Sequence, residues 1–192
     1  MVIGILALQG AVEPHEQKFK SLGTKTAWVK QPKDLEGLNG IVLPGGESST
    51  MLHLLKLHGL WDALKNFVET KPAWGLCAGA ILLAKEVQSP SQDSLGVLDI
   101  GVTRNAYGRQ TESFISLLEP NSHWLGTEAV EGVFIRAPKI NRVGSKVKTL
   151  FTFGGEPVMV QRHCTLASTF HPELSESTQL HQYFLKICQE PA

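Results

Sequence analysis

A cysteine between a predicted strand and a predicted helix is the first residue of this sequence that could do chemistry. The run Gly75-Leu76-Cys77-Ala78-Gly79 has the shape of a nucleophile elbow, a sharp turn from strand to helix. Small neighbours permit the tight turn, and the helix start supplies free N–H groups and a positive dipole end that favour the reactive thiolate. Because buried structural cysteines are common, an inert cysteine in a glycine-rich turn is the alternative.

A histidine and a glutamate at the end of a later predicted strand could serve such a nucleophile. His171 follows the strand-like run 166–170, Glu173 lies two residues further on, and Pro172 fixes the backbone between them. Active sites of open α/β folds lie at the carboxyl ends of strands, where the carboxylate can hold one imidazole nitrogen while the other faces the nucleophile. The alternative is a solvated turn with an incidental histidine and glutamate.

A glycine pair, Gly45-Gly46, opens a polar run at 44–50 between another predicted strand and helix. Two adjacent glycines let a peptide turn its N–H toward a ligand, as an oxyanion hole requires. An anion-binding loop and a plain helix cap by one of the hydroxyl residues at 48–50 are competing interpretations. The run lacks the lysine and the spacing of a phosphate-binding P-loop.

These segments need elements to position them, and strand and helix signals alternate in the first half of the chain. Continuous apolar runs predict buried parallel strands, and periodic segments bounded by Pro or Gly predict helices. The predicted strands are 2–8, 26–29, 41–43 and 73–76, and the predicted helices are 13–22, 51–57, 60–68 and 78–84. Such alternation implies a mainly parallel sheet with helices on both faces.

The second half contains short strand-like runs separated by Gly, Pro and Asn, which predict antiparallel strands and hairpins. These runs are 100–104, 113–118, 133–135, 149–153, 158–161 and 166–170. A last helix is predicted at 177–188, with Leu180, Tyr183, Phe184, Ile187 and Cys188 on one apolar face. The expected fold class is α/β: one doubly wound, mostly parallel sheet, with helices on both faces and antiparallel strands added in the second half, in a single domain spanning 1–192.

Composition excludes several classes of function. The chain has 192 residues, 42% of them hydrophobic and 19% charged, which indicates one globular domain. Lys+Arg and Asp+Glu balance at 18 each, so nucleic-acid binding has no electrostatic support. No apolar stretch is long enough for a membrane span, and the N-terminus lacks the basic start of a signal peptide. An odd number of cysteines, 3, disfavours a disulfide framework and favours a reducing cytoplasm.

Taken together, the segments around Cys77, His171 and the glycine pair Gly45-Gly46 resemble the triad-type glutamine amidotransferases, the class I glutaminase family. Two further runs, Arg104-Asn105-Ala106-Tyr107-Gly108-Arg109-Gln110 and Val133-Phe134-Ile135-Arg136-Ala137-Pro138, are similar to signatures of its subfamily, the glutaminase subunits of pyridoxal phosphate synthase. The opening Leu8-Gln9-Gly10-Ala11-Val12 and the Pro-Gly-Gly-Glu-Ser run fit the same subfamily. The resemblance covers 2 to about 184 and is loosest at 119–131 and 139–152, where no motif matches.

The resemblance implies a role for each matching residue. Cys77 takes the position of the nucleophile, and His171 and Glu173 complete the catalytic triad. The oxyanion hole would be formed by the backbone N–H groups of Gly46 and Ala78. The implied glutamine-binding residues are Gly46, Glu47, Ser48, Arg104, Ile135 and Arg136.

The same resemblance implies partners. Free glutamine is the substrate, and the ammonia passes to a barrel-fold synthase subunit, with a dodecameric core, that builds pyridoxal phosphate from a pentose phosphate and a triose phosphate. Gln9 and Gly10 match the face that meets this subunit. No cofactor is expected, and no metal, because no second pair joins His163 and Cys164 at zinc-ligand spacing.

Other interpretations stay open. A glutaminase that feeds another biosynthetic enzyme would keep the triad but not the run at 104–110. A γ-glutamyl peptidase would use the same triad on a bound peptide and would work without a synthase. A non-catalytic binding module usually has a broken triad, and here it is whole. Arg104 and Arg136 are either ordinary surface charges or readers of the substrate carboxylate.

Overall fold

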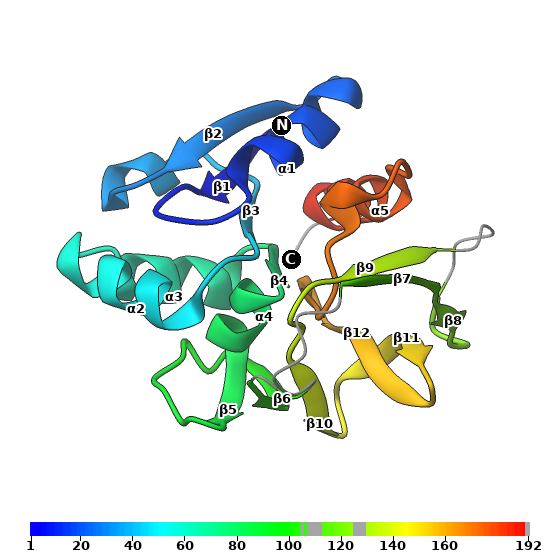
Figure 1. Cartoon of the computed structure of the whole chain (residues 1–192). Coiled ribbons are helices and arrows are strands. Elements are labelled where there is room, and N and C mark those ends of the chain that lie inside the picture. The colour runs from blue at the N-terminus through cyan, green and yellow to red at the C-terminus, as the bar shows by residue number, and fades with distance from the viewer. Residues whose placement is uncertain (105, 107–112, 125–129, 191–192) are drawn as a thin grey trace.

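The computed structural model describes residues 1–104, 106, 113–124 and 130–190 (Figure 1). Most of the predicted signature at 104–110 therefore lies outside the described residues, with only Arg104 and Ala106 inside them. In the part that the structure describes, no helix has both the length and the apolar character that a membrane span needs.

The largest sheet among the described residues has eight strands. Across the sheet they are β2 (Lys25–Val29), β1 (Val2–Leu6), β3 (Gly40–Leu43), β4 (Ala73–Leu76), β13 (Thr165–Ser168), β12 (Glu156–Arg162), β11 (Lys148–Phe153) and β8 (Glu119–Pro120). Every pairing from β2 to β13 is parallel, and every pairing from β13 to β8 is antiparallel. The predicted sheet, mostly parallel with antiparallel additions from the second half, is confirmed.

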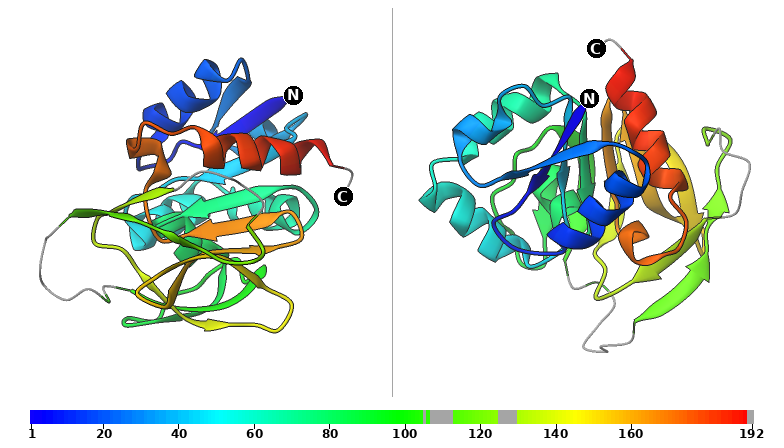
Figure 2. Two further views of the ribbon diagram at one scale, coloured as in Figure 1. Left: turned by 90° about the vertical axis from the view of Figure 1, so that its right-hand side faces the viewer. Right: turned by 90° about the horizontal axis from the view of Figure 1, so that it is seen from above.

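Helices cover both faces of this sheet, as predicted (Figure 2). On one face α1 (Val12–Ser21) and α5 (Gln179–Gln189) contribute Phe19 and Phe184 to a core cluster with Trp74. On the other face α2 (Ser48–Leu57), α3 (Trp61–Thr70) and α4 (Ala78–Leu83) contribute Leu55, Leu64 and Leu82 to a second cluster. Side chains of β4 alternate between the two clusters, because successive residues of a strand point to opposite faces.

Two small sheets flank the large one. One contains β5 (Ala84–Gln88), β6 (Leu98–Thr103) and β10 (Lys139–Val143), and the other pairs β7 (Phe114–Leu117) with β9 (Glu131–Phe134). The sequence patterns predict β6, β7 and β9 but miss β5 and β10. Both missed strands mix charged and apolar residues, and each pairs with β6 through a register shift that breaks simple alternation. Two 3-10 turns, η1 (Pro32–Leu35) and η2 (Pro172–Leu174), complete the described elements.

Candidate active site

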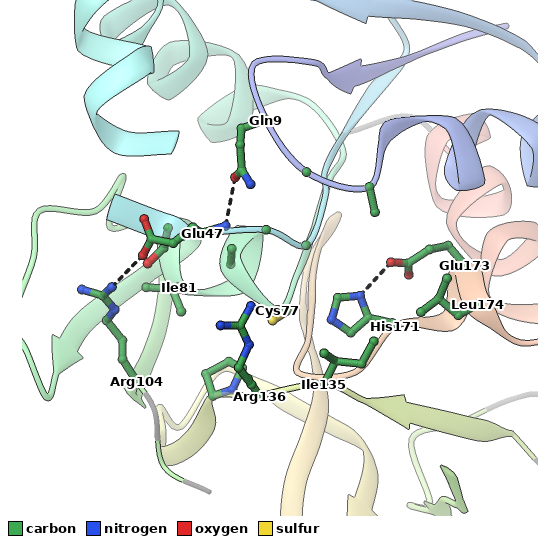
Figure 3. A pocket seen from close by; sticks show the side chains of 17 residues that line it. Gln9, Glu47, Cys77, Ile81, Arg104, Ile135, Arg136, His171, Glu173 and Leu174 are labelled. Atoms are coloured by element: carbon green, nitrogen blue, oxygen red, sulfur yellow. Dashed lines mark hydrogen bonds and ion pairs between the residues drawn. The ribbon is translucent and has the colours of Figure 1, made fainter. Parts of the chain in front are cut away.

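Four loops meet at one edge of the large sheet. Because β1, β3, β4 and β13 run parallel, their carboxyl ends lie on the same side, and the segments 9–11, 45–48, 77–78 and 171–173 follow them there. A cavity of about 370 Å³ lies between these loops (Figure 3). All residues predicted for the triad, the oxyanion hole and glutamine binding line it: Gly46, Glu47, Ser48, Cys77, Ala78, Arg104, Ile135, Arg136, His171 and Glu173.

Cys77 occupies a strained turn between β4 and α4. Its φ of 48° and ψ of −102° lie in a region that residues with a side chain rarely adopt. The neighbouring strand holds this conformation, since the Cys77 N–H donates to the Ser168 carbonyl at 2.8 Å. Strain of this kind persists where surrounding structure fixes it, often at functional sites. The predicted elbow is therefore confirmed as a geometry, with a buried sulfur at the cavity wall.

The glycines on either side of Cys77 allow backbones to touch. A Cβ at Gly79 would lie 2.0 Å from the Leu43 carbonyl oxygen of β3. A Cβ at Gly75 would lie 2.5 Å from the Gly79 carbonyl oxygen. The start of α4 is therefore seated directly on two strands, and the direction of the Cys77 side chain follows from that contact.

His171 is held from three directions. Its Nδ1 lies 2.7 Å from Glu173 Oε1, and both side chains are buried. Its backbone N–H donates to the Val133 carbonyl of β9 at 2.8 Å, which ties the triad to the small sheet. On the third side the chain passes so closely that a Cβ at Gly45 would lie 2.3 Å from His171 Cε1. The imidazole is therefore fixed in orientation as well as in place.

The charge of His171 follows from its partners. Burial alone lowers its pKa, but hydrogen bonds and negative charge from Cys77 and Glu173 outweigh burial and raise the pKa to about 10. His171 is then an imidazolium at neutral pH, beside the Cys77 sulfur. Such a pair can supply both a thiolate nucleophile and a proton donor for a leaving group.

The segment 9–11 after β1 braces the glycine pair. The Ala11 N–H donates to the Gly45 carbonyl at 3.1 Å, and the Gln9 side-chain oxygen accepts from the Glu47 N–H at 2.9 Å. Gly46 therefore lies between two held peptides, next to the cavity. Gln9 and Gly10, predicted only as part of a partner face, lie in the cavity wall as well.

Glu47 caps the helix that follows the glycine pair. Its Oε2 accepts from the Thr50 N–H and the Ser49 hydroxyl, both at 2.6 Å. Partial burial works to raise the pKa of Glu47, but these hydrogen bonds prevail and lower it to about 2, so the side chain is an anion. The helix cap is thus Glu47 and not one of the hydroxyl residues at 48–50. Helix α2 begins at Ser48, three residues earlier than predicted.

Two arginines complete the polar wall. Arg104 Nη2 lies 3.1 Å from Glu47 Oε1, and Arg136 points into the cavity from the end of β9 with a φ of 44° (Figure 3). Ser48 is buried and donates its hydroxyl to Gln92 Oε1 at 2.9 Å. Pro138, the last residue of the predicted signature at 133–138, lines the cavity as well, and so do Ile81 and Leu174, which carry no sequence motif and were not predicted.

Solved structures share this architecture. One described as glutamine amidotransferase is 44% identical, with a TM-score of 0.91, and the match covers 99% of this chain and 100% of that one. PurLQS from Thermotoga maritima matches with a TM-score of 0.71 over 96% of this chain and 97% of that one, but at 13% identity the likeness concerns the fold alone. The fold is that of the glutamine amidotransferases.

Sequence relatives narrow this class. A protein of Deinococcus radiodurans is 48% identical over 100% of both chains, and one of Koribacter versatilis is 49% identical over 97% of this chain and 95% of its own. Both are named pyridoxal 5'-phosphate synthase subunit PdxT. Residues 5–190 match the SNO glutamine amidotransferase family. This chain belongs to the SNO glutamine amidotransferase family.

Proposed function

We propose that this protein hydrolyses L-glutamine to L-glutamate and ammonia and supplies the ammonia to a pyridoxal phosphate synthase subunit. The observation that carries the proposal is the placement of His171 between Glu173 and the strained Cys77, in a cavity with charged groups of both signs. Family membership and the names of the full-length relatives support the same activity.

The proposed reaction is acyl transfer to water in two steps. The Cys77 thiolate attacks the side-chain carbonyl carbon of glutamine, and the N–H groups of Gly46 and Ala78 receive the developing oxyanion. His171 gives its proton to the departing nitrogen, which leaves as ammonia. Neutral His171 then takes a proton from water, the hydroxide attacks the thioester, and glutamate leaves as the thiolate re-forms. Glu173 orients the imidazole throughout.

The charges of the cavity suit a free amino acid. Glutamine carries an α-ammonium and an α-carboxylate, which Glu47 and the arginines can bind with complementary charge. Arg104 and Glu47 already lie at the mouth as an ion pair, and Arg136 reaches toward the centre (Figure 3). Ile135 and Ser48 would complete the set of glutamine contacts. The glutamyl residue of a γ-glutamyl peptide carries the same two α-charges, so it is membership of a glutamine amidotransferase family that favours free glutamine.

The partner is proposed from the relatives, whose names describe them as synthase subunits. We propose a barrel-fold synthase subunit with a dodecameric core, in the cytoplasm, that uses the ammonia to build pyridoxal phosphate from a pentose phosphate and a triose phosphate. Gln9 and Gly10 would face it. Because both also line the cavity, docking on this segment would bring the partner next to the site of ammonia release.

A glutaminase assay with and without a purified barrel synthase subunit tests the proposal. We expect glutamate release that increases with the synthase, and pyridoxal phosphate formation from glutamine that Cys77→Ala abolishes. Ammonium chloride should restore pyridoxal phosphate formation with this variant, because the synthase needs only the ammonia. Glutamine hydrolysis unaffected by Cys77→Ala would refute the mechanism, and no binding to any such synthase would refute the partner.

A further inference from the structure

Two histidines are buried behind the triad, on the side of Glu173 away from the cavity. His15 of α1 and His181 of α5 are each 0% exposed, and His15 Nδ1 lies 3.1 Å from His181 Nε2. The other nitrogen of His15, Nε2, lies 3.6 Å from Glu173 Oε2. The side chains therefore form a continuous row from the interior of the protein to His171.

The carboxylate of Glu173 has one oxygen without a hydrogen-bond partner. Oε1 pairs with His171, but Oε2 is buried and has no partner among the described residues. A buried carboxylate oxygen that accepts no hydrogen bond is costly, and native structures seldom leave one. The nearest candidate donor is His15 Nε2, which is itself buried and without a partner. The two buried atoms without partners, Glu173 Oε2 and His15 Nε2, therefore face each other.

Only one arrangement of protons satisfies this row. Burial, followed by the charges of His181 and His171, lowers the pKa of His15 well below its usual value, so the ring is neutral and has a single N–H. If that N–H were on Nδ1, the lone pair of Nε2 would face the carboxylate, acceptor against acceptor. If the N–H is on Nε2, His15 donates to Glu173, and its Nδ1 accepts from the Nε2–H of His181. The His181 ring is also neutral, because burial lowers its pKa to about 3.

We propose that His181 and His15 form a directed hydrogen-bond chain that donates to Glu173 Oε2, which makes His15 a positioning residue for the glutaminase reaction. The inference rests on the proposed function for its catalytic part alone. A small approach of the two side chains turns the 3.6 Å contact into a hydrogen bond, since N–H···O bonds reach to about 3.2 Å. With both oxygens held, Glu173 cannot rotate away from His171.

The surroundings of the row are also defined. Trp74 packs edge-on against both rings, with centroid distances of 6.2 Å to His15 and 5.2 Å to His181. The charged groups that act on the row from neighbouring segments are His171 and Lys18. The Lys18 amine donates to the carbonyl oxygens of Ser175 and Glu176, which hold it beside the segment that follows η2.

Nitrogen NMR of the unmodified full-length protein, labelled with ¹⁵N-histidine, reads the tautomers directly. We expect His15 and His181 each to carry the proton on Nε2 at neutral pH, with an unprotonated Nδ1. A proton on His15 Nδ1 would overturn the proposal, because the ring would then turn a lone pair toward Glu173. This measurement does not involve glutamine, so it stands or fails separately from the proposed function.

Paired variants test the catalytic part in the complex with the synthase subunit. His15→Leu removes the donor, whereas His15→Gln keeps an N–H for Glu173 and an oxygen for His181. Loss of a hydrogen bond to a charged group predicts a fall in kcat of roughly tenfold or more for His15→Leu, with KM nearly unchanged. His15→Gln should restore most of the rate. Equal rates for wild type and a folded His15→Leu would overturn the positioning role.

A pH titration distinguishes a positioning role of His15 from a general loss of structure in the variant. Without the His15 donor, Glu173 is free to rotate and stabilises the His171 imidazolium less, which lowers the pKa of His171 from its value of about 10. The pKa of His171, followed by nitrogen NMR, should therefore fall by about one unit for a tenfold effect in His15→Leu but not in His15→Gln. The same shift in both variants, or in neither, would contradict the proposal.

Discussion

The reactivity proposed for Cys77 depends on its neighbours rather than on its being a cysteine. Burial raises the pKa of Cys164, and burial followed by the nearby Cys164 raises the pKa of Cys188 to about 12, so both stay thiols. Cys77 alone among the three lies beside an imidazolium. A glutamine-mimicking alkylating reagent should therefore label Cys77 alone, as peptide mass spectrometry would show.

Substitutions at two of the three cysteines provide the controls for this prediction. Cys77→Ala should abolish labelling and turnover while the circular dichroism spectrum stays unchanged, since the new side chain is smaller and the site is at the cavity wall. Cys164→Ser should leave labelling and turnover near wild-type values. Labelling that persists in Cys77→Ala would assign the reactive thiol elsewhere.

The two arginines of the cavity should act on substrate capture more than on chemistry. Arg104 and Arg136 hold no proton that they could release at neutral pH, and contacts to the α-groups of glutamine are made equally in the ground and transition states. Replacing either with alanine should raise KM by roughly tenfold to a hundredfold, as loss of a charge-assisted hydrogen bond predicts, with kcat changed little.

The matched control for the arginine variants is Arg142→Ala. Arg142 pairs with Asp99 and Glu86 on the small sheet of β5, β6 and β10, away from the residues that line the cavity. Its removal should leave KM for glutamine unchanged. A collapsed kcat with an intact KM in Arg104→Ala or Arg136→Ala would refute their assignment to substrate capture.

At the scale of elements, alanine substitutions at two glycines should differ in their effects on stability and on activity. Gly79→Ala would drive a Cβ to 2.0 Å from a β3 carbonyl oxygen, so α4 must lift off the sheet, and we expect a loss of several kcal/mol in urea denaturation. Gly45→Ala meets the ring of His171 instead of backbone, so it should displace the imidazole and remove most turnover at a smaller cost in stability.

Gly59 offers a matched control between α2 and α3. Its φ of +62° strains any side chain, but a Cβ there meets nothing within 4 Å. Gly59→Ala should cost about 1 kcal/mol and leave kcat intact. If Gly45→Ala kept the turnover of Gly59→Ala, the close approach to His171 would not matter for catalysis.

At the scale of the whole molecule, the buried histidines should make stability depend on pH. Burial holds the pKa of His15 well below 6.5 and that of His181 at about 3, so both rings stay neutral in the folded state. Below pH 6.5 the unfolded chain binds protons that the folded chain does not, and the free energy of unfolding falls as pH falls. The slope is up to about 1.4 kcal/mol per pH unit for each ring.

Urea denaturation at pH 7, 6 and 5 measures this slope. His181→Leu should flatten it, because one buried ring no longer contributes, even if the variant is less stable at every pH. His53→Gln, at an exposed position of α2, should leave the slope as in wild type. An unchanged slope in His181→Leu would show that the acid sensitivity comes from other groups.

The isolated chain should be a poor glutaminase that the synthase subunit activates. The segment 9–11 holds the Gly45 carbonyl and the Glu47 N–H, and so fixes the peptide between Gly45 and Gly46. Two glycines can flip that peptide at little steric cost, and an oxyanion donor pointing away lowers kcat by about a hundredfold or more. Docking on Gln9 and Gly10 would need to favour the flipped peptide by only a few kcal/mol.

Titration of the synthase into the isolated chain tests this activation. We expect kcat for glutamine hydrolysis to rise with the bound fraction, while alkylation of Cys77 by iodoacetamide changes little, because the thiolate does not depend on the oxyanion hole. An isolated chain already at full rate, with no change on demonstrated binding, would leave no role for the peptide flip.

Local patterns of the sequence determined a large part of the fold and of the site. The apolar run of β4 and the all-apolar α4 predict two buried elements, and the small residues around Cys77 predict the tight turn between them. The geometry confirms each prediction, because tight turns and burial depend on neighbours a few residues away. The resemblance to a known family supplied the residues proposed for glutamine binding, among them Arg104 and Arg136, which periodicity alone would have left as surface charges.

Only the tertiary structure decided which distant segments meet. Strand order places β4 between β3 and β13, and this brings Gly45 and His171 into contact with each other in the cavity that Cys77 lines. The packing of α1 and α5 on one face of the large sheet brings His15 next to His181 and Glu173. No spacing in the sequence predicts this row of side chains. A lone histidine has the same sequence signature whether it is buried or exposed. Its neighbours, and through them its charge and tautomer, exist only once strands far apart in the chain have paired.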